Sequence, residues 1–281
     1  MGLDINAVQF LISAHKSGIQ FGRTVMLGRQ STIAADTVST MLERDGLAAA
    51  KFREASKTCD YAEPLFEALG ATQVETMDNS AFEGAKLIHD LNQPIPSGWK
   101  EQFDVVCDGG TLEHVFNFPI ALRNVMELLR PGGRLFIHTC ANNCCGHGFY
   151  QFSPELFYRA LSPENGFEVE RMIIHRPGPY GRWHEVSDPE KIRERVELIT
   201  FMPMLMLVQA RRVKVVPIFA REPQQSDYSV MWQASHTPTA LRKKGRMSTW
   251  LSPFKTGLEF YRRQSLFNRR FFKPIKKRDG V

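Results

Sequence analysis

The stretch FDVVCDGGTLEHVFNFPIALRNVMELLRPGGRLFIHT, residues 103–139, decides the fold. Phe103–Cys107 is a continuous apolar run that stops at Asp108-Gly109-Gly110, which predicts a buried strand followed by a tight loop. Apolar residues at helical spacing follow Asn117, a good N-cap residue, until Pro131-Gly132-Gly133 ends the helix and a second strand begins. Strand, helix and strand in this order make a βαβ unit, and continuously apolar strands indicate a parallel sheet covered on both faces.

Ligands of such sheets bind beyond the carboxyl ends of the strands. We therefore expect residues 108–113, after the first of these strands, and residues 139–147, after the second, to face a binding site. Polar side chains are frequent in both segments, and His114 and His147 lie at the same predicted edge.

FDVVCDGGTLEHV followed by LRPGGRLFIHT resembles the fourth-strand and fifth-strand segments of class I S-adenosylmethionine-dependent methyltransferases. The Pro-Gly-Gly before an apolar strand and the Leu-Glu-His before a helix carry the resemblance, although any doubly wound domain can end a helix with Pro-Gly-Gly. The resemblance implies an α/β fold with a Rossmann-like, doubly wound, seven-stranded sheet. That sheet is mostly parallel and ends in a C-terminal antiparallel hairpin.

The closing hairpin has candidates in this sequence. Asn165-Gly166 predicts a turn, Phe167–His175 a sixth strand, and the apolar stretch 201–216 a seventh. NAD-binding Rossmann domains lack this hairpin, so the pattern favours S-adenosyl-L-methionine over a dinucleotide as cofactor.

The sequence departs from the family after its first predicted strand, Thr24–Leu27. The family's glycine-rich loop is replaced by LGRQSTI, in which Gly28 is the only glycine and Arg29 follows it. Glycines in that loop let the backbone approach the cofactor closely. Residues 31–60 contain two predicted helices and form a helical insertion, of a kind that often covers the acceptor pocket in this family.

Acidic residues after the next two predicted strands match the family's adenosine-binding positions. Asp78, followed by Asn79, matches the acid that accepts both ribose hydroxyls. Asp90 matches the acid that accepts from the adenine amino group, and Leu91 would supply a backbone amide to the ring. The resemblance also implies that Gly28, Arg29, Asp108, Gly109 and Gly110 line the cofactor site. The alternative is that Asp78 and Asp90 only stabilise turns.

Methyl transfer to a hydroxyl requires a group that removes a proton, and histidine suits that task near neutral pH. His147, between two glycines, is the better candidate for this base, and His114 belongs to the Leu-Glu-His pattern. Cys140, Cys144 and Cys145 precede His147, but structural zinc normally has two separated ligand pairs, so we predict no metal.

Charge divides the chain. Residues 242–281 hold 13 Lys and Arg against Glu259 and Asp279, whereas the whole chain is only +6. We expect a methyltransferase-like domain at 1–222 and a basic, Phe-rich C-terminal extension at 223–281, with the sheet complete before it. The basic tail fits contact with nucleic-acid phosphates or an anionic membrane surface. The oligomeric state is left open.

No secretory leader or apolar run of about 18 residues is present, and the five cysteines fit a reducing compartment. We therefore expect a cytoplasmic protein, with peripheral membrane contact as an option. The predicted function is transfer of a methyl group to an O or N atom of a small or glycan-like acceptor. The alternative is a non-catalytic domain of the same fold, suggested by the altered glycine loop. The insertion, the 140–150 loop and the 176–194 segment are expected to converge on the acceptor.

Overall fold

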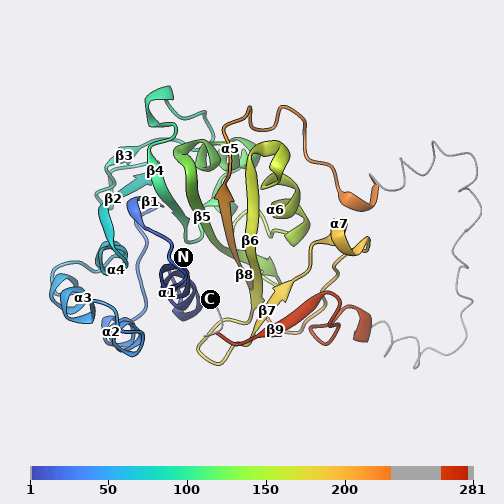
Figure 1. Ribbon diagram of the computed structural model, residues 1–281, viewed down its shortest axis with the longest axis horizontal. Coiled ribbons are helices and arrows are strands. Elements are labelled where there is room, and N and C mark those ends of the chain that lie inside the picture. Colours follow the sequence, from blue (N-terminus) through green and yellow to red (C-terminus); the bar gives the residue numbers. More distant parts are fainter. Residues whose placement is uncertain (1, 229–260, 278–281) are drawn as a thin grey trace, which may run out of the picture.

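A computed structural model describes residues 2–228 and 261–277 of the chain. Its centre is one sheet of nine strands in the order β3-β2-β1-β4-β5-β8-β6-β7-β9 (Figure 1). The strands are β1 (Gly22–Leu27), β2 (Ala71–Asp78), β3 (Leu87–Ile88), β4 (Phe103–Asp108), β5 (Leu129–Asn142), β6 (Phe167–His175), β7 (Trp183–Val186), β8 (Met204–Arg212) and β9 (Phe272–Ile275).

Strands β1 to β5 pair in parallel, and β8 lies antiparallel between β5 and β6. This arrangement confirms the predicted Rossmann-like fold with its antiparallel C-terminal strands. One detail of the prediction was wrong. The sheet has nine strands rather than seven, because β7 and β9 extend it, whereas β8 lies within the stretch predicted as the seventh strand.

Helices cover both faces of the sheet, as continuously apolar strands require. They are α1 (Ile5–Lys16), α2 (Ala35–Arg44), α3 (Ala49–Ser56), α4 (Glu63–Ala68), α5 (Phe118–Leu128), α6 (Pro154–Ala160) and α7 (Pro189–Ile192), with 3₁₀ turns η1 (Ser97–Trp99), η2 (Leu112–His114) and η3 (Pro163–Asn165). Alternate strand residues enter two cores. Val106 packs with α5 and α6, whereas its neighbour Cys107 packs with α1, α2, α3 and α4.

The Pro131-Gly132-Gly133 segment acts differently from the prediction. Helix α5 already ends at Leu128, and β5 starts at the next residue, so the three residues lie in the first part of the strand. Gly132 has a positive φ of 85°, and a Cβ on Gly133 would lie 2.9 Å from the carbonyl oxygen of Asp104. The glycines therefore let β5 turn sharply against β4.

The predicted insertion after β1 is present as α2 and α3. Their buried side chains, among them Val38, Leu42 and Phe52, pack in the core that α1 and α4 share. Figure 1 shows α2 and α3 at the lower left, with α1 between them and β7 and β9 at the lower right. The insertion therefore extends the α1 layer and does not meet the 176–194 segment, so the expected convergence of all three segments was wrong.

The C-terminal extension is part of the sheet. Strand β9 pairs antiparallel with β7, and Phe271 and Phe272 are buried in the core beside α5 and α6. The expectation that the sheet is complete before residue 223 was wrong. The high positive charge of the C-terminal extension suggested an appendage, although two of its phenylalanines belong to the core. The basic residues 242–260 lie outside the described part of the chain.

Phe272 supplies a test of this attachment. Phe272→Ala should lower the free energy of unfolding by about 3–5 kcal/mol, because the fully buried ring leaves a cavity. Phe267→Ala in the same segment is the control and should cost far less, since that ring is 75% exposed. Urea unfolding measures both. Equal, small losses would mean that the segment does not contribute to the stability of the core.

Candidate functional site

The carboxyl ends of β1, β2 and β4 meet at one edge of the sheet. The backbone N–H of Gly28, just after β1, donates to the carbonyl oxygen of Met77 at 2.7 Å. A Cβ placed on Gly28 would lie 3.2 Å from Thr111 Oγ1 and 3.8 Å from Asp78 Oδ2. The predicted residues Gly28 and Asp78 are therefore neighbours, and the loop after β4 completes the edge.

Gln30, which sequence reasoning missed, fills the centre of this edge. Its Nε2 donates to the carbonyl oxygen of Leu27 at 2.5 Å and approaches Thr111 Oγ1 at 3.4 Å. Its Oε1 is buried, has no hydrogen-bond partner among the described residues, and would lie 2.7 Å from a Cβ on Gly109. Gly109 is needed because the glutamine packs directly on its backbone. The signal in the sequence was a long polar side chain where the family has a glycine.

Asp108 ends β4 as a fully buried carboxyl group. Oδ1 accepts from the backbone N–H of Thr111 at 2.8 Å and of Leu112 at 3.4 Å, and Gly110, with a φ of 104°, allows this tight turn. Oδ2 has no partner within the described chain. Burial, and then the negative charge of Glu113, raise the pKa of Asp108 to about 8.

Glu113 is the other residue that sequence reasoning missed. Its carboxylate is fully buried, and neither oxygen has a hydrogen-bond partner in the described residues. The loop that carries His147 is fixed to it, because the N–H of Phe149 donates to the Glu113 carbonyl oxygen at 2.8 Å. A Cβ on Gly148 would lie 2.8 Å from that same oxygen. Only a glycine lets the loop come this close.

This loop places His147 over the buried carboxylate. His147 Nε2 lies 3.5 Å from Glu113 Oε1, and the imidazole is about one third exposed. The ring of His114 crosses that of His147 edge-on, with 4.9 Å between centroids. The structure thus brings both predicted catalytic histidines together, with an unpredicted glutamate beneath them.

Two groups of side chains in the described residues have the geometry to hold a metal ion. The ligand atoms of Glu113, His114 and His147 lie within 4.8 Å of one another. So do those of a second group, Asp4, His138 and His175, on the α1 face of the sheet. Cys140, Cys144 and Cys145 belong to neither group, and all five cysteines are free thiols.

The second group is held apart from solvent. Burial, and then His138, lower the pKa of His175 to about 4, and burial also lowers the pKa of His138. Asp4 Oδ1 lies 3.6 Å from His138 Nε2, but it also accepts the N–H groups of Asn6 and Ala7 as the N-cap of α1. This carboxylate therefore has a local structural role in the helix.

The two predicted adenosine-binding acids lie in turns at the edge. Asp78 Oδ1 accepts from the N–H of Ser80 at 3.2 Å, next to the exposed Asn79. Asp90 is exposed, and hydrogen bonds from the backbone and side chain of Asn92 lower its pKa. Leu91 is different, because its side chain packs in the core.

Arg29 makes contacts away from the ends of the strands. Its guanidinium donates to Glu63 Oε1 at 2.7 Å and to the carbonyl oxygen of Glu83 at 2.9 Å, and it stacks over Tyr61. These three contacts connect the loop after β1 to α4 and to the turn after β2. The described geometry therefore gives Arg29 a role in fixing the loop, and its predicted contact with a cofactor stays a prediction.

A pocket lies farther along the same edge, where β6 ends and β8 begins. Its rim, Thr200 to Met204, is bonded to the loop that carries His147: Asn143 Nδ2 donates to the carbonyl oxygens of Thr200 at 2.6 Å and Met202 at 3.1 Å. The 140–150 loop is therefore joined to the pocket rim, which lies after the 176–194 segment in sequence.

Residues 27–137, which span this edge from β1 to β5, match the family model of a methyltransferase domain. This match, together with the mostly parallel sheet and its antiparallel C-terminal strands, supports a class I S-adenosylmethionine-dependent methyltransferase fold for this part of the chain. This confirms the interpretation of the Leu-Glu-His and Pro-Gly-Gly segments. S-adenosylmethionine is the cofactor of this family. The search of curated protein sequences found no match to the chain.

Several solved structures are similar to this chain. A 1,6-didemethyltoxoflavin-N1-methyltransferase of Burkholderia thailandensis has 14% identity over 75% of this chain and 80% of its own, with a TM-score of 0.40. An S-adenosylmethionine dependent methyltransferase of Mesorhizobium loti has 16% identity over 72% and 95%, with a TM-score of 0.39. A putative methyltransferase of Bacillus halodurans has 11% identity over 72% and 99%, with a TM-score of 0.37.

None of the described helices is both long enough and apolar enough to span a membrane.

The buried Asp108 predicts a pH dependence of stability. Its folded pKa of about 8 exceeds the ordinary 3.8, so the native state binds an extra proton between these values and the free energy of unfolding falls as the pH rises through them. Asp108→Asn is neutral at every pH and should flatten this slope. Urea unfolding at about pH 5 and about pH 8 measures it. Identical slopes in the two proteins would assign the titration to another group.

Proposed function

We propose that the protein transfers the methyl group of S-adenosylmethionine to an O or N atom of a small or glycan-like acceptor. One observation carries the proposal. Gln30 Oε1, Asp108 Oδ2 and the Glu113 carboxylate are buried acceptors without donors in the described chain, and they cluster where the strands end. A bound ligand with N–H donors or positive charge would satisfy these buried acceptors.

S-adenosylmethionine fits that requirement, because it carries a sulfonium, an ammonium and the hydroxyl and amino donors of adenosine. When bound, it supplies a methyl group that is already activated for transfer. Asp78 and Asp90, farther along the edge, offer carboxylate oxygens to the ribose and the adenine. A dinucleotide fits less well, because its diphosphate would approach an edge of carboxyl groups.

The residues of the altered glycine loop suit the same cofactor in a different way. Gln30 packs on the backbone of Gly109, so its side chain occupies space next to the loop after β4. Gln30 Oε1 offers an acceptor to the ammonium group. The replacement of the family's loop glycines by other residues therefore does not by itself favour the non-catalytic alternative.

His147 is the proposed base. It takes the proton from the acceptor, while the Glu113 carboxylate beneath stabilises the positive charge that the ring acquires. His114 packs against the same ring and keeps its orientation. Alignment of the acceptor with the methyl group supplies the rest of the rate enhancement.

Calorimetry with S-adenosylmethionine tests the cofactor site. Asp78→Ala should weaken binding by about 1.5–3 kcal/mol, because a charge-assisted hydrogen bond to the ribose is lost. Asp36→Ala, an exposed carboxylate on α2, is the matched control and should bind like the wild type. Absence of binding to the wild-type protein at millimolar cofactor would instead support the non-catalytic binding domain.

A second experiment tests the base. Release of S-adenosylhomocysteine in the presence of fractionated small metabolites first supplies a working acceptor. With it, His147→Ala should lower turnover about 10²- to 10⁴-fold and leave cofactor affinity nearly unchanged. Glu113→Gln should lower turnover as well. If a chelator abolishes turnover and a divalent cation restores it, then Glu113, His114 and His147 act as metal ligands and the base assignment is wrong.

A further inference from the structure

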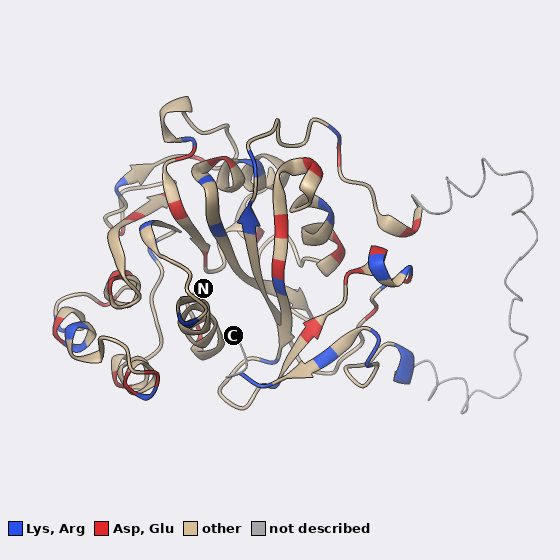
Figure 2. Cartoon of the chain, viewed as in Figure 1, with Lys and Arg blue, Asp and Glu red and all other residues tan. Residues whose placement is uncertain are grey.

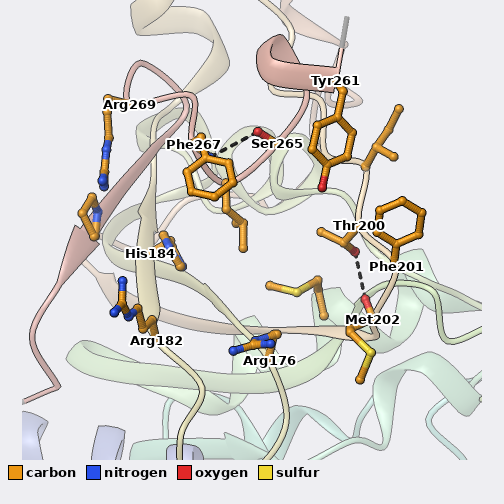
Figure 3. Close-up of a pocket in the computed structure, with 14 residues that line it drawn as sticks. Arg176, Arg182, His184, Thr200, Phe201, Met202, Tyr261, Ser265, Phe267 and Arg269 are labelled. Atoms are coloured by element: carbon orange, nitrogen blue, oxygen red, sulfur yellow. Dashed lines mark hydrogen bonds between the residues drawn. The ribbon is translucent and has the colours of Figure 1, made fainter. Parts of the chain in front are cut away.

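The pocket beyond the His147 loop has a volume of about 430 Å³, within the range of small-molecule sites. Residues from β6 to β8 form its floor and one wall, and the C-terminal segment that ends in β9 closes it (Figure 3). It is lined by Arg176, Arg182, His184, Ile199, Thr200, Phe201, Met202, Met204, Tyr261, Ser265, Leu266, Phe267, Arg269 and Pro274.

The charged residues of this lining are all basic. Three arginines contribute, Arg176, Arg182 and Arg269, and the described lining contains no carboxylate. None of the three guanidiniums has an ion pair or hydrogen bond to a described residue, whereas Arg263 and Arg270 beside them both pair with Glu194. In the sequence, residues 229–260 add five lysines and arginines and one acid, Glu259.

Two of the three arginines, Arg182 and Arg269, lie close enough to His184 to act on its charge. Burial lowers the pKa of His184, and the charges of Arg269 and then Arg182 lower it further. Figure 3 shows Arg269, Arg182 and Arg176 along one side of the pocket, with His184 beside them. Figure 2 shows the same basic bias along β9 and the helical turn that precedes it. Unpaired arginines gathered in one concave site are a typical arrangement for binding phosphate.

The aromatic side of the pocket runs from Phe267, beside Arg269, to Tyr261 and Phe201, which lie across from the arginines. Phe201 is 88% exposed and Phe267 75%, and Tyr261 packs against Phe201 with 6.1 Å between ring centroids. Figure 3 shows Tyr261 and Phe201 across the pocket from the arginines. Exposed rings around a cavity are suited to cover the flat face of a ligand.

We propose that this pocket binds a small molecule in which a diphosphate or phosphate group is joined to a ring system, with the anion on the three arginines and the ring against the aromatic side. A nucleoside diphosphate, free or linked to a sugar, has this chemistry. The role of this ligand as methyl acceptor rests on the proposed function, whereas its binding to the pocket does not. The pocket rim is bonded to the His147 loop, so a ligand held by its diphosphate can extend toward that histidine.

Calorimetry of the full chain with uridine diphosphate, uridine diphosphate glucose, inorganic diphosphate and uridine tests the proposal. The two nucleotides should bind at least about tenfold more tightly than uridine, since each charge-assisted hydrogen bond contributes about 1.5–3 kcal/mol. Arg176→Gln, Arg182→Gln and Arg269→Gln should each weaken nucleotide binding about tenfold or more. Arg53→Gln, on α3 and paired with Glu43, is the control and should change nothing.

Phe267→Ala separates the two halves of the pocket. It should weaken uridine diphosphate but leave inorganic diphosphate unchanged, because only the nucleotide has a ring to stack. Nucleotide binding no tighter than uridine, or arginine variants that bind like the wild type, would overturn the proposal. Binding to phosphatidylglycerol vesicles without binding to either nucleotide would also overturn it, because the anion would then belong to a membrane lipid.

The same variants distinguish this proposal from the proposed function. Affinity for S-adenosylmethionine should be unchanged in all of them, since the three arginines lie outside the cofactor edge. Nucleotide binding without cofactor binding would contradict the methyltransferase function and leave the anion pocket supported. Cofactor binding without nucleotide binding would support the methyltransferase function and contradict the anion pocket.

Discussion

Parallel pairing of β4 with β1 on one side and β5 on the other is the constraint on which the site depends. The register sets Leu27 beside Asp108 and Asp108 beside Ile137, so β1 and β4 end at the same level, whereas β5 continues to Asn142. The segments after β1 and β4 turn at that level, which brings Gly28 close to Thr111, and the loop after β5 returns to contact Glu113. Burial of both sheet faces supplies the free energy that holds this register.

The polar and charged groups along this edge of the sheet fall into two separate sets of opposite character. Buried acceptors and carboxyl groups gather at the ends of β1 and β4, whereas unpaired arginines gather near β6, β7 and β9. A buried carboxylate without donors is costly, and exposed like charges repel one another, so neither half is at its most stable without a ligand. A cationic methyl donor and an anionic acceptor would relieve the two halves separately and meet near His147.

The C-terminal extension has a part in both stability and binding. Phe271 and Phe272 anchor it in the core, and β9 adds a strand to the sheet beside β7. The turn between Tyr261 and β9 then supplies Ser265, Phe267 and Arg269 to the pocket. A segment that the charge distribution alone marked as an appendage thus lines one side of a cavity whose other described residues come from 176–204.

The sequence by itself determined those features that depend on local chemistry. Apolar runs and helical spacing identified β4, α5 and β5. Ser153 is the N-cap of α6, and its side chain accepts a hydrogen bond from the backbone N–H of Glu155. Gly70 follows α4 and has a positive φ of 88°. The edge at which Asp78 and Asp108 meet also followed from the sequence, because parallel strands must end at the same side of a sheet.

Only the tertiary structure decided the contacts between distant segments. Nothing in the local sequence indicates that Gln30 turns inward over Gly109 or that Glu113 is buried under His147. The same is true of the pairing between the two four-residue strands β7 and β9. Short edge strands have little periodicity of their own, and a polar side chain is buried only when its partners arrive from elsewhere in the chain. These placements depend on packing across the whole sheet, which spacing and composition do not encode.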